Sequence, residues 1–463
     1  MTEQTAFQSL PLREELLSAM RVIGFSTMTS VQQRAIPIAL SGKDVIAKAS
    51  TGSGKTLAFG LPILQQLDAT QRAPSSIVLC PTRELAEQVA EQLRDAAKHL
   101  ANTKILTLCG GVPMPPQIAS LSHGANIIVG TPGRILDHLS KRRLDLSRVT
   151  HLVLDEADRM LDMGFEDALA AVLQSVPDSA QCLLFSATFP PEVESIVNGL
   201  APTAERVDVT EAEVLPDIQQ LIYRVDNKLR VETLKAVITE YQPPRCIVFC
   251  ATKDETQRVT DELQASGFLA VCLHGDLEQR ERTEMLAMFS ADCAQVLIAT
   301  DVAARGLDIE DVPLVVNFRV SEDVSTHVHR IGRTGRAGKA GLAVSLMAAQ
   351  DEIFVARIEE HFNQSIPSKG AQSLRFHANR IVPPAFNMVI IKGGKKEKLR
   401  PGDILGALTQ DAQVPNEDIG KIKITATTSY VAIKQRSIKR TLAFFRDGKI
   451  KGKRLRARKI AIV

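Results

Sequence analysis

Two short segments of the sequence carry residue types that could perform phosphate chemistry. The first, 49–56, reads Ala-Ser-Thr-Gly-Ser-Gly-Lys-Thr and departs from the phosphate-binding pattern GxxxxGK[ST] only at its first glycine. The second follows about a hundred residues later, where the apolar run 151–154 ends in Asp155 and Glu156. A phosphate loop upstream of a strand that ends in two carboxylates predicts hydrolysis of a nucleoside triphosphate.

Each residue type in these segments has its own expected task. Glycines let backbone N–H groups approach the phosphates, Lys55 supplies a positive charge, and Thr56 and Asp155 can hold Mg²⁺. Glu156 can position and polarise the attacking water. Without the loop, the two acidic residues would more simply cap a helix. The expected nucleotide contacts in the loop are Ala49, Ser50, Thr51, Gly52, Ser53, Gly54, Lys55 and Thr56.

Residues 30–205 predict the scaffold that positions these side chains. Short apolar runs alternate with amphipathic stretches, in one of which Leu85, Val89 and Leu93 recur every fourth residue. Alternating strands and helices predict a doubly wound parallel sheet, in which sites form at the carboxyl ends of the strands. Strands are expected at 45–47, 77–80, 104–109, 127–129, 151–154 and 183–185.

The same pattern restarts after a polar segment, 208–217, which we expect to be a linker. A second unit without its own phosphate loop has expected strands at 246–250, 269–274, 296–300, 314–317 and 342–346. A second linker is expected at 363–385, followed by a small unit with the order βαββαβ. Its strands are expected at 387–391, 421–424, 430–434 and 450–459, and its helices at 403–408 and 435–445. The predicted domains are therefore 1–207, 218–362 and 386–463.

Composition places the chain among soluble globular proteins. It has 463 residues, of which 44% are hydrophobic and 24% charged, enough for about three domains. The seven cysteines fall mostly in apolar runs without the spacing of a zinc site, so we expect buried, reduced thiols. No run of 18 apolar residues predicts a membrane span, and the first residues do not resemble a signal peptide. We expect a cytoplasmic protein without a membrane partner.

Charge is distributed unevenly along the chain. Residues 386–463 hold 19 lysines and arginines against 6 aspartates and glutamates, a net charge of +13, whereas the whole chain carries +3. A small basic unit therefore follows an acidic body. This asymmetry predicts a polyanionic partner such as a nucleic acid.

A second group of basic residues lies within the second unit, in the run His329-Arg-Ile-Gly-Arg-Thr-Gly-Arg336. Arginines three residues apart would share one face of a helix. The run could be a solvated basic helix. Alternatively, arginines delivered from a neighbouring domain could stabilise the charge that builds up during phosphoryl transfer.

Taken together, these motifs resemble those of the DEAD-box RNA helicases, whose name matches the tetrad Asp155-Glu-Ala-Asp158. The resemblance covers about residues 7–360 and implies two tandem RecA-like parallel-sheet domains followed by a small α+β domain similar to an RRM. The further motifs that carry it are Gly24–Gln32, Pro81–Leu85, Gly110-Gly111, Thr131–Arg134, Ser186–Thr188, Ala299–Ile309 and His329–Arg336.

The resemblance implies an ATP site completed by the second domain. In a Q motif spanning 5–33, Phe7 would stack on adenine and Gln32 would read its edge, although Met28 and Ser30 stand where the family usually has prolines. Gly306 and Asp308 would approach the nucleotide from the second domain. Arg333 and Arg336 would reach the γ-phosphate.

The resemblance also implies an RNA track and a coupling network. Contacts to phosphate and 2′-OH would discriminate RNA without reading its sequence. Closure of two mobile domains around ATP and one bent strand would open a few base pairs locally and non-processively. The coupling residues would be Asp158, Ser186, Thr188 and His329. The RNA track would use Arg83, Gly111, Thr131, Arg134 and Thr300, with neighbours of His274–Asp276 and Gln279–Arg282.

The basic C-terminal unit resembles an RRM in strand order but lacks most of the aromatic residues that an RRM carries on its sheet surface. Its aligned third-strand stretch, 426–433, keeps only Tyr430 as an aromatic, so we expect RNA recognition through loops and an edge. The glycine- and lysine-rich segments 393–403 and 448–453 are similar to those of a bacterial DEAD-box subfamily. That resemblance implies binding to a 23S rRNA hairpin near the peptidyl-transferase centre and a role in large-subunit assembly. The basic residues expected to bind are Lys395, Lys396, Lys398, Lys451, Lys453 and Arg454.

Other functions remain open at this point. A DNA-directed helicase would conflict with the adenine-reading motif and the DEAD tetrad, and stimulation of the ATPase by RNA or DNA distinguishes the two. An ATP-gated RNA clamp without hydrolysis would conflict with intact Lys55, Asp155, Glu156 and Arg336. The C-terminal unit could also be a non-specific electrostatic tether, which would make the protein a general RNA remodeller. The sequence itself points to no protein partner.

Overall fold

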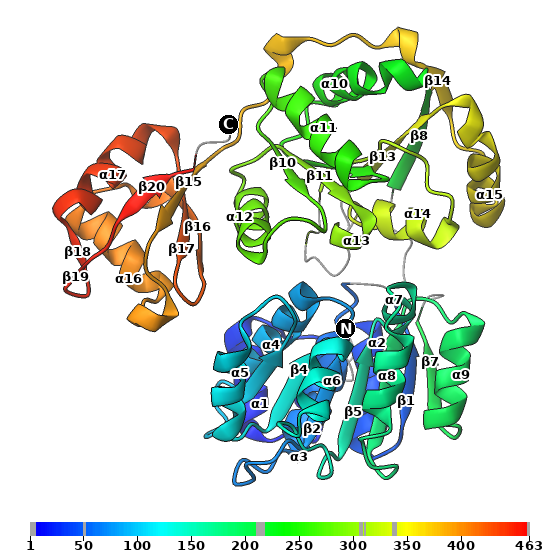
Figure 1. Cartoon of the computed structure of the whole chain (residues 1–463), viewed down its shortest axis with the longest axis vertical. Helices are drawn as coiled ribbons and strands as arrows, with labels where there is room; N and C mark the ends of the chain where they lie inside the picture. The colour runs from blue at the N-terminus through cyan, green and yellow to red at the C-terminus, as the bar shows by residue number, and fades with distance from the viewer. Residues whose placement is uncertain are drawn as a thin grey trace. The chain divides into compact units, whose positions relative to one another are not determined.

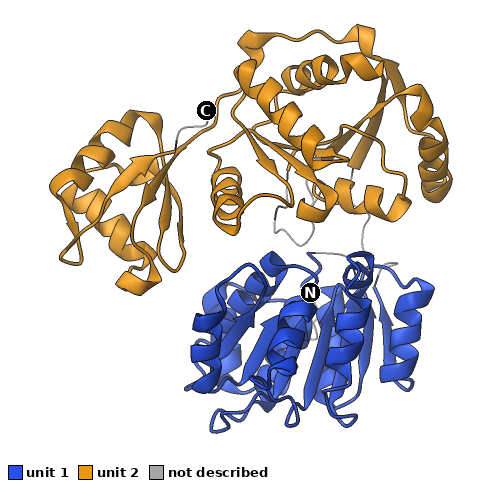
Figure 2. Ribbon diagram, in the orientation of Figure 1, with its two compact units in different colours: residues 1–214, 306–308 blue, residues 215–305, 309–463 orange. Residues whose placement is uncertain are grey.

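The computed structural model of the chain has two compact units (Figure 2). The first holds residues 1–214 with 306–308, and the second holds 215–305 with 309–463. The second unit therefore contains both the second parallel sheet and the C-terminal domain. The structure describes residues 6–49, 52–209, 218–304, 309, 312–335 and 340–460.

The first unit is built on a parallel β-sheet with the strand order β3-β4-β2-β5-β6-β1-β7 (Figure 1). Because all its described pairs are parallel, the loops that follow the strands gather at one edge. The strands are β1 (Val45–Lys48), β2 (Ser76–Leu79), β3 (Ile105–Leu108), β4 (Ile127–Gly130), β5 (His151–Asp155), β6 (Gln181–Ser186) and β7 (Glu205–Asp208).

The edge strand β7 is the strand of this sheet that the sequence does not predict. Its four residues, Glu-Arg-Val-Asp, include one apolar side chain, Val207, and only that side chain is buried. The strand forms because it pairs in parallel with β1, which places Val207 beside Ala47. Tertiary pairing thus overrides a polar local sequence.

Helices cover both faces of this sheet and enclose two apolar cores. Alternate strand residues point to opposite faces, so Val45 packs under α1 to α4 and Ile46 packs under α6 to α9. The helices are α1 (Glu14–Ile23), α2 (Ser30–Leu40), α3 (Lys55–Gln66), α4 (Arg83–Ala96), α5 (Met114–Ser122), α6 (Pro132–Ser140), α7 (Ala157–Asp162), α8 (Glu166–Leu173) and α9 (Pro191–Leu200).

The second unit begins with another parallel sheet, in the order β10-β11-β9-β12-β13-β8-β14. Its strands are β8 (Ile218–Arg224), β9 (Cys246–Cys250), β10 (Ala270–Leu273), β11 (Val296–Thr300), β12 (Leu314–Asn317), β13 (Gly341–Met347) and β14 (Ser368–Gly370). Its helices are α10 (Arg230–Tyr241), α11 (Lys253–Ala265), α12 (Gln279–Ser290), α13 (Asp301–Ala304), α14 (Val324–Ile331) and α15 (Glu352–Phe362).

The segment 363–385, expected to be a linker, is bound to this domain along its length. It supplies β14, which pairs with β8, and Leu374 and Phe376 pack against the apolar core of the sheet. The Phe376 and Phe268 rings lie 6.0 Å apart between centroids. The sequence does not predict this packing because the segment lacks a regular apolar periodicity. Its few apolar residues are isolated in the sequence and contact the core one at a time.

The C-terminal domain is an antiparallel sheet in the order β16-β17-β15-β20, which matches the predicted βαββαβ arrangement. The last predicted strand, 450–459, is wrong. Lys451 and Gly452 adopt positive φ and turn the chain into a short hairpin before β20. The elements are β15 (Asn387–Ile391), α16 (Pro401–Gly406), β16 (Ile419–Ile424), β17 (Ser429–Ile433), α17 (Ile438–Asp447), β18 (Lys449–Ile450), β19 (Lys453–Arg454) and β20 (Ala457–Lys459).

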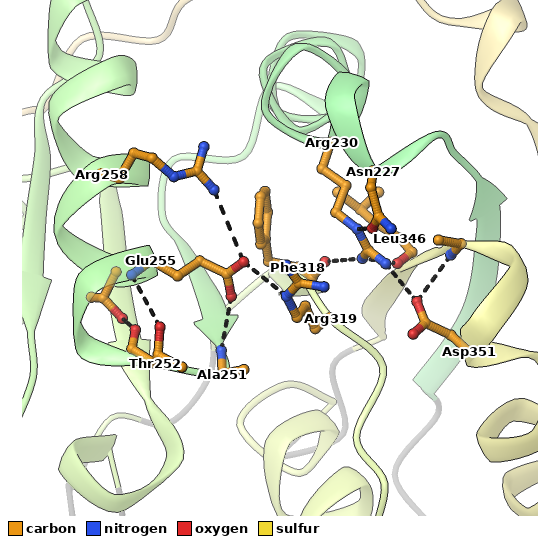
Figure 3. A network of polar contacts seen from close by, with 12 residues as sticks. Asn227, Arg230, Ala251, Thr252, Glu255, Arg258, Phe318, Arg319, Leu346 and Asp351 are labelled. Carbon is orange, nitrogen blue, oxygen red and sulfur yellow. Dashed lines mark hydrogen bonds and ion pairs between the residues drawn. The ribbon is translucent and has the colours of Figure 1, made fainter.

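A buried arginine holds the second parallel sheet to its helices (Figure 3). Arg230, at the start of α10, is 2% exposed and donates to the carbonyl oxygens of Phe318 and Leu346, the latter at 2.6 Å. Its guanidinium also contacts Asp351 at 2.5 Å and Asn227 at 2.8 Å. One side chain therefore ties the ends of β12 and β13 to the turn before α15.

Replacing Arg230 with methionine should destabilise the second unit by about 3–5 kcal/mol, because Asp351 and two carbonyl groups would remain buried without their partner. The matched control, Lys253→Met, breaks an exposed ion pair with Asp276 and should cost less than about 1 kcal/mol. Denaturant unfolding combined with amide hydrogen exchange in β12 and β13 measures both. Equal losses in the two variants would contradict the role given to Arg230.

Candidate nucleotide and RNA sites

The phosphate loop connects β1 to α3 and is shaped by glycine. Gly52 and Gly54 adopt φ of 81° and 91°, a left-handed conformation that glycine adopts at no steric cost. Ala49 N donates to Ser186 O at 3.0 Å, which joins the start of the loop to the end of β6. Lys55 begins α3 with a buried side chain whose Nζ lies 3.4 Å from Ala49 O. Its ammonium group is therefore positioned inside the loop.

Gln32 attaches the Q motif to this loop. Its Nε2 donates to Gly54 O at 2.9 Å, and its Oε1 accepts from Thr29 N at 2.9 Å. A Cβ on Gly54 would lie 2.5 Å from Gln32 Nε2, so the approach requires glycine. The predicted adenine reader is thereby held beside the loop despite Met28 and Ser30.

Phe7 is buried in the first unit. It begins a short 3₁₀ helix, Phe7–Ser9, and is 1% exposed within the apolar core. Apolar burial of the side chain accounts for this position. Its stacking on adenine stays a prediction.

The two carboxylates at the end of β5, Asp155 and Glu156, are withdrawn from water. Asp155 is 2% exposed, and burial raises its pKa to about 6, with Lys55 opposing and Glu156 reinforcing that rise. Among the described residues, Asp155 Oδ1 and Glu156 Oε2 have no hydrogen-bond donor. Glu156 adopts φ of 55°, an unusual conformation for a residue with a side chain.

The Oδ1 atom of Asp155, which has neither a hydrogen-bond donor nor an ion-pair partner among the described residues, suits a hard divalent cation. Mg²⁺ is bound by one or two protein oxygens together with substrate phosphates. The described residues include no cluster of three or more His, Cys, Asp or Glu that would hold a metal alone. Asp155 and the half-buried Thr56 therefore fit Mg²⁺ that arrives with a nucleotide.

Arg159 is a residue that the motifs alone do not single out. It is 1% exposed, and its Nη1 lies 3.2 Å from Glu156 Oε2. It also lowers the pKa of Asp155 against the larger effect of burial. An arginine three residues after an acidic residue on a helix is ordinarily a surface pair, so only the burial reveals its place in the site.

The coupling residues of the first unit are joined directly. Asp158 Oδ2 accepts from Thr188 N at 2.9 Å and from Thr188 Oγ1 at 2.7 Å. Asp158 N donates to Ser186 Oγ at 3.2 Å. Although burial raises the pKa of Asp158, the hydrogen bonds from Thr188 and Ser186 outweigh it and hold that pKa below its usual value. The loop after β6 is therefore hydrogen-bonded to the carboxylate of Asp158 on α7, the helix that follows β5.

The predicted RNA residues of the first unit gather on the other half of the sheet edge, after β2, β3 and β4. The Arg83 guanidinium lies against Gly111, where a Cβ would be 1.7 Å from its Nη1. Arg134 Nη1 donates to Val112 O and Gln117 Oε1, each at 3.0 Å. Thr131 is buried at the start of α6 and donates through its N to Leu108 O. The structure brings these four predicted residues together, and their contact with RNA stays a prediction.

In the second unit, the arginine run is not one helical face as expected. Helix α14 ends at Ile331, so Arg333 lies in the turn beyond it. Arg330 points inward and makes two bonds to Asp301, at 2.6 and 2.7 Å. This pair, to which the motifs assign no role, joins α14 to the end of β11, where Thr300 lies.

Other predicted residues of this unit can be placed individually. His329 is half-buried on α14, and Arg333 is 5% exposed. Ser50, Thr51, Gly306, Asp308 and Arg336 lie outside the described residues, as do residues 210–217 of the first expected linker.

The basic residues of the C-terminal domain gather at one end of its sheet. Three loops meet there, since Lys395 N donates to Thr425 O at 2.9 Å and Lys392 N donates to Arg456 O at 2.8 Å. A Cβ on Gly394 would lie 2.3 Å from Thr425 O, so only glycine permits this approach. The predicted binding residues are all exposed: Lys395, Lys396, Lys398, Lys451, Lys453 and Arg454.

Lys451 differs from the rest of this basic end because its ammonium group is already engaged. It lies 3.2 Å from an Asp403 carboxylate oxygen and donates to Lys398 O at 3.1 Å. Lys451 thus also holds the hairpin against the first loop.

Comparisons with known proteins identify the family of this chain. The family model for the DEAD/DEAH box helicase matches residues 29–196, and that for the helicase conserved C-terminal domain matches 229–338. The chain is 46% identical to the ATP-dependent RNA helicase DbpA of Escherichia coli (strain K12), over 98% of this chain and 99% of that protein. The chain belongs to the DEAD-box RNA helicases. It is an ATP-dependent enzyme that acts on RNA.

Further similarities extend over the whole helicase. The family model for the DbpA RNA binding domain matches residues 389–459. DbpA of Bacillus subtilis (strain 168) is 35% identical over 98% of this chain and 99% of that protein. The structure of S. cerevisiae Dbp5 bound to RNA and ADP BeF3 matches with a TM-score of 0.73 and 31% identity, covering 80% of this chain and 96% of that one. The predicted family and the two RecA-like domains are confirmed. Among the described residues, no helix is long and apolar enough to cross a membrane.

The raised pKa of Asp155 predicts a pH effect on stability without nucleotide. Between about pH 4 and pH 6 the folded protein keeps a proton that the unfolded chain releases, so the unfolding free energy should fall as pH rises. The slope is at most about 1.4 kcal/mol per pH unit. Asp155→Asn removes this group, and its stability relative to wild type should increase up to about pH 6 and then level off. Denaturant unfolding across this range measures the difference, and parallel curves would refute the assignment.

Proposed function

We propose that this helicase is an RNA-dependent ATPase that unwinds RNA locally and non-processively in the cytoplasm. We further propose that its C-terminal domain directs it to a 23S rRNA hairpin near the peptidyl-transferase centre, for a role in assembly of the large ribosomal subunit. The observation that carries the proposal is the pairing of a DEAD-box ATP site with a basic domain that the DbpA RNA-binding model matches.

For hydrolysis, Lys55 and the loop glycines bind the phosphates, and Glu156 orients and polarises the attacking water. Bound Mg²⁺, held by Thr56 and Asp155, would neutralise developing charge on the phosphates. Arg159 holds the side chain of Glu156 in place through an ion pair, since its guanidinium lies 3.2 Å from that carboxylate. Withdrawal from water strengthens each of these charge interactions.

Completion of the site by the second unit is part of the proposal. Arg333 and Arg336 would stabilise the γ-phosphate during transfer, while Gly306 and Asp308 would contact the nucleotide. The Arg330–Asp301 pair supports this because it fixes the segment from which Arg333 projects. Asp158, Ser186, Thr188 and His329 would then transmit closure to the RNA.

RNA selection is proposed to occur at the basic end of the C-terminal sheet. Its exposed lysines and arginines attract phosphate, and three interlocked loops give them a fixed spacing. A fixed array of charges can distinguish a folded hairpin from unstructured RNA by shape. A purely electrostatic tether would lack this distinction, and the helicase would then be a general RNA remodeller.

Glu156→Gln tests the catalytic assignment. The variant should bind ATP and RNA about as well as wild type, yet hydrolyse ATP about 10²–10⁴-fold more slowly, because the amide cannot act as a base. Filter binding and steady-state phosphate release measure the two properties. As a control, Glu166→Gln replaces an exposed carboxylate on α8 and should leave turnover unchanged. Full turnover by Glu156→Gln would remove the proposed role, whereas an inactive wild type would revive the clamp alternative.

The RNA preference is tested with Lys395→Ser/Lys396→Ser. In wild type, a 23S fragment that carries the hairpin should stimulate the ATPase at lower concentration than bulk RNA. The double variant should lose this advantage, and its log–log salt dependence should flatten by about 0.7–0.9 for each phosphate that is no longer neutralised. Lys439→Ser removes an exposed lysine from α17 and serves as the control. If wild type shows no preference for the fragment, the proposed target is incorrect.

A further inference from the structure

Gln117, to which no motif assigns a role, is buried beside Arg134 of the predicted RNA track. It lies on α5 and is 5% exposed. Its Nε2 donates to Cys109 O at 3.0 Å. Its Oε1 accepts from Arg134 Nη1 at 3.0 Å and lies 2.9 Å from His138 Nε2. One amide group thus joins the carboxyl end of β3 to two residues of α6.

The orientation of this amide follows from the chemistry of its partners. A backbone carbonyl can only accept and a guanidinium can only donate, so the NH₂ group of Gln117 faces Cys109 and its oxygen faces Arg134. His138 Nε2 meets the same oxygen and must therefore carry a proton. Burial, and then the charge of Arg134, lower the pKa of His138. His138 consequently donates as a neutral ring and adds no charge beside Arg134.

The contacts of Arg134 leave one edge of its guanidinium open. Both hydrogens of Nη1 are used, one by Gln117 Oε1 and the other by Val112 O at 3.0 Å. Nε and Nη2 make no hydrogen bond to any described residue, and neither atom is enclosed. The N–H groups of Nε and Nη2 form a fork that matches two oxygens of one phosphate.

A neutral amide suits the position of Gln117 better than a carboxylate would. Glutamate could also orient Arg134, but it would neutralise the guanidinium and weaken its attraction for phosphate. It would also place an acceptor against Cys109 O, where a donor is needed. Gln117 instead orients the guanidinium and leaves its full charge available to a polyanion.

The same contacts fix the glycine turn between two predicted RNA contacts. Gln117 holds Cys109 O at one end of the turn, and Arg134 holds Val112 O at the other. The second glycine of the turn has φ of 67°, and the Arg83 guanidinium lies against it. The turn that separates the two arginines is therefore anchored by Gln117.

We propose that Gln117 and His138 are positioning residues for RNA binding, which orient Arg134 so that its Nε and Nη2 edge faces one RNA phosphate. The inference rests on the proposed RNA-dependent ATPase and on the predicted RNA contact of Arg134. It adds two buried residues that act on RNA through Arg134 and do not touch RNA themselves.

Gln117→Met in the full chain tests this role, because methionine fills a similar volume but cannot hold the guanidinium. The concentration of bulk RNA that half-saturates the ATPase should rise severalfold, while the KM for ATP and the kcat at saturating RNA stay unchanged. Binding of a single-stranded oligouridylate with ADP and beryllium fluoride should lose about 0.7 from its log–log salt slope, the share of one phosphate. The matched control, Gln92→Met, replaces an exposed glutamine on α4 and should change none of these quantities.

His138 is tested by a pair of substitutions. His138→Leu removes a donor to Gln117 Oε1 and should also raise the RNA concentration needed for half-saturation. His138→Gln should restore much of the wild-type behaviour, since its Nε2 can donate from a similar place. His99→Leu replaces an exposed histidine and serves as the control. Equal impairment in His138→Leu and His138→Gln would overturn the role of His138.

A double-mutant cycle with Arg134→Met separates the remaining outcomes. Gln117→Met should add nothing to Arg134→Met, because the guanidinium that it positions is gone. An additive loss, or an equal loss of ATP affinity, would overturn the inference and leave Gln117 a structural residue. If Arg134→Met weakens RNA binding and Gln117→Met does not, the positioning role alone fails. If RNA does not stimulate the wild-type ATPase, the proposed function fails, and the salt slope of oligouridylate binding still decides the inference.

Discussion

The structure of the ATP site depends on two carboxylates held out of water at the end of β5. Their mutual repulsion and reduced hydration are costly, and Lys55, Arg159 and a hydrogen bond from the Glu156 backbone oppose that cost. The loop must therefore bring Lys55 inward, which requires left-handed glycines and the attachment of Ala49 to β6. Asp158 is buried close by, and its hydrogen bonds with Thr188 and Ser186 compensate for the lost hydration of its carboxylate. The contacts of the phosphate loop and those of the coupling residues therefore both stabilise buried carboxylates.

The sequence predicts much of this arrangement because the relevant patterns are local. Apolar runs predict the inner strands other than β8, and the glycine and lysine spacing predicts the phosphate loop. The strands β7 and β14 escape prediction because they are polar and form only through pairing with a neighbour. The strand β8 also escapes prediction, because the polar Gln219 and Gln220 interrupt its apolar run. Arg159 and Arg330 escape for a related reason: an arginine signals nothing until its burial and its acidic partner are known.

In the C-terminal domain, too, the sequence predicts most strands but not what covers them. Its strand order is predictable, and the scarcity of aromatic residues argues against base stacking on the sheet. The sheet face opposite α16 and α17 is nevertheless apolar, and an alternating strand pattern cannot reveal whether that face is covered. Only the structure shows that Ile390 and Tyr430 on this face are buried. The loss of the aromatic residues that an RRM uses for base stacking is therefore best interpreted together with the burial of the residues that remain on that face.

The attachment of Gln32 to the phosphate loop has a consequence for the choice of nucleobase. An amide side chain offers two donor hydrogens and two acceptor lone pairs. Thr29 N can only donate and Gly54 O can only accept, so one of each is already used and the orientation of the amide is fixed. One donor and one acceptor remain. That pair is complementary to the N7 and amino group of adenine, whereas guanine offers two acceptors along the same edge. The loop that binds phosphate would thereby also impose which triphosphate is admitted.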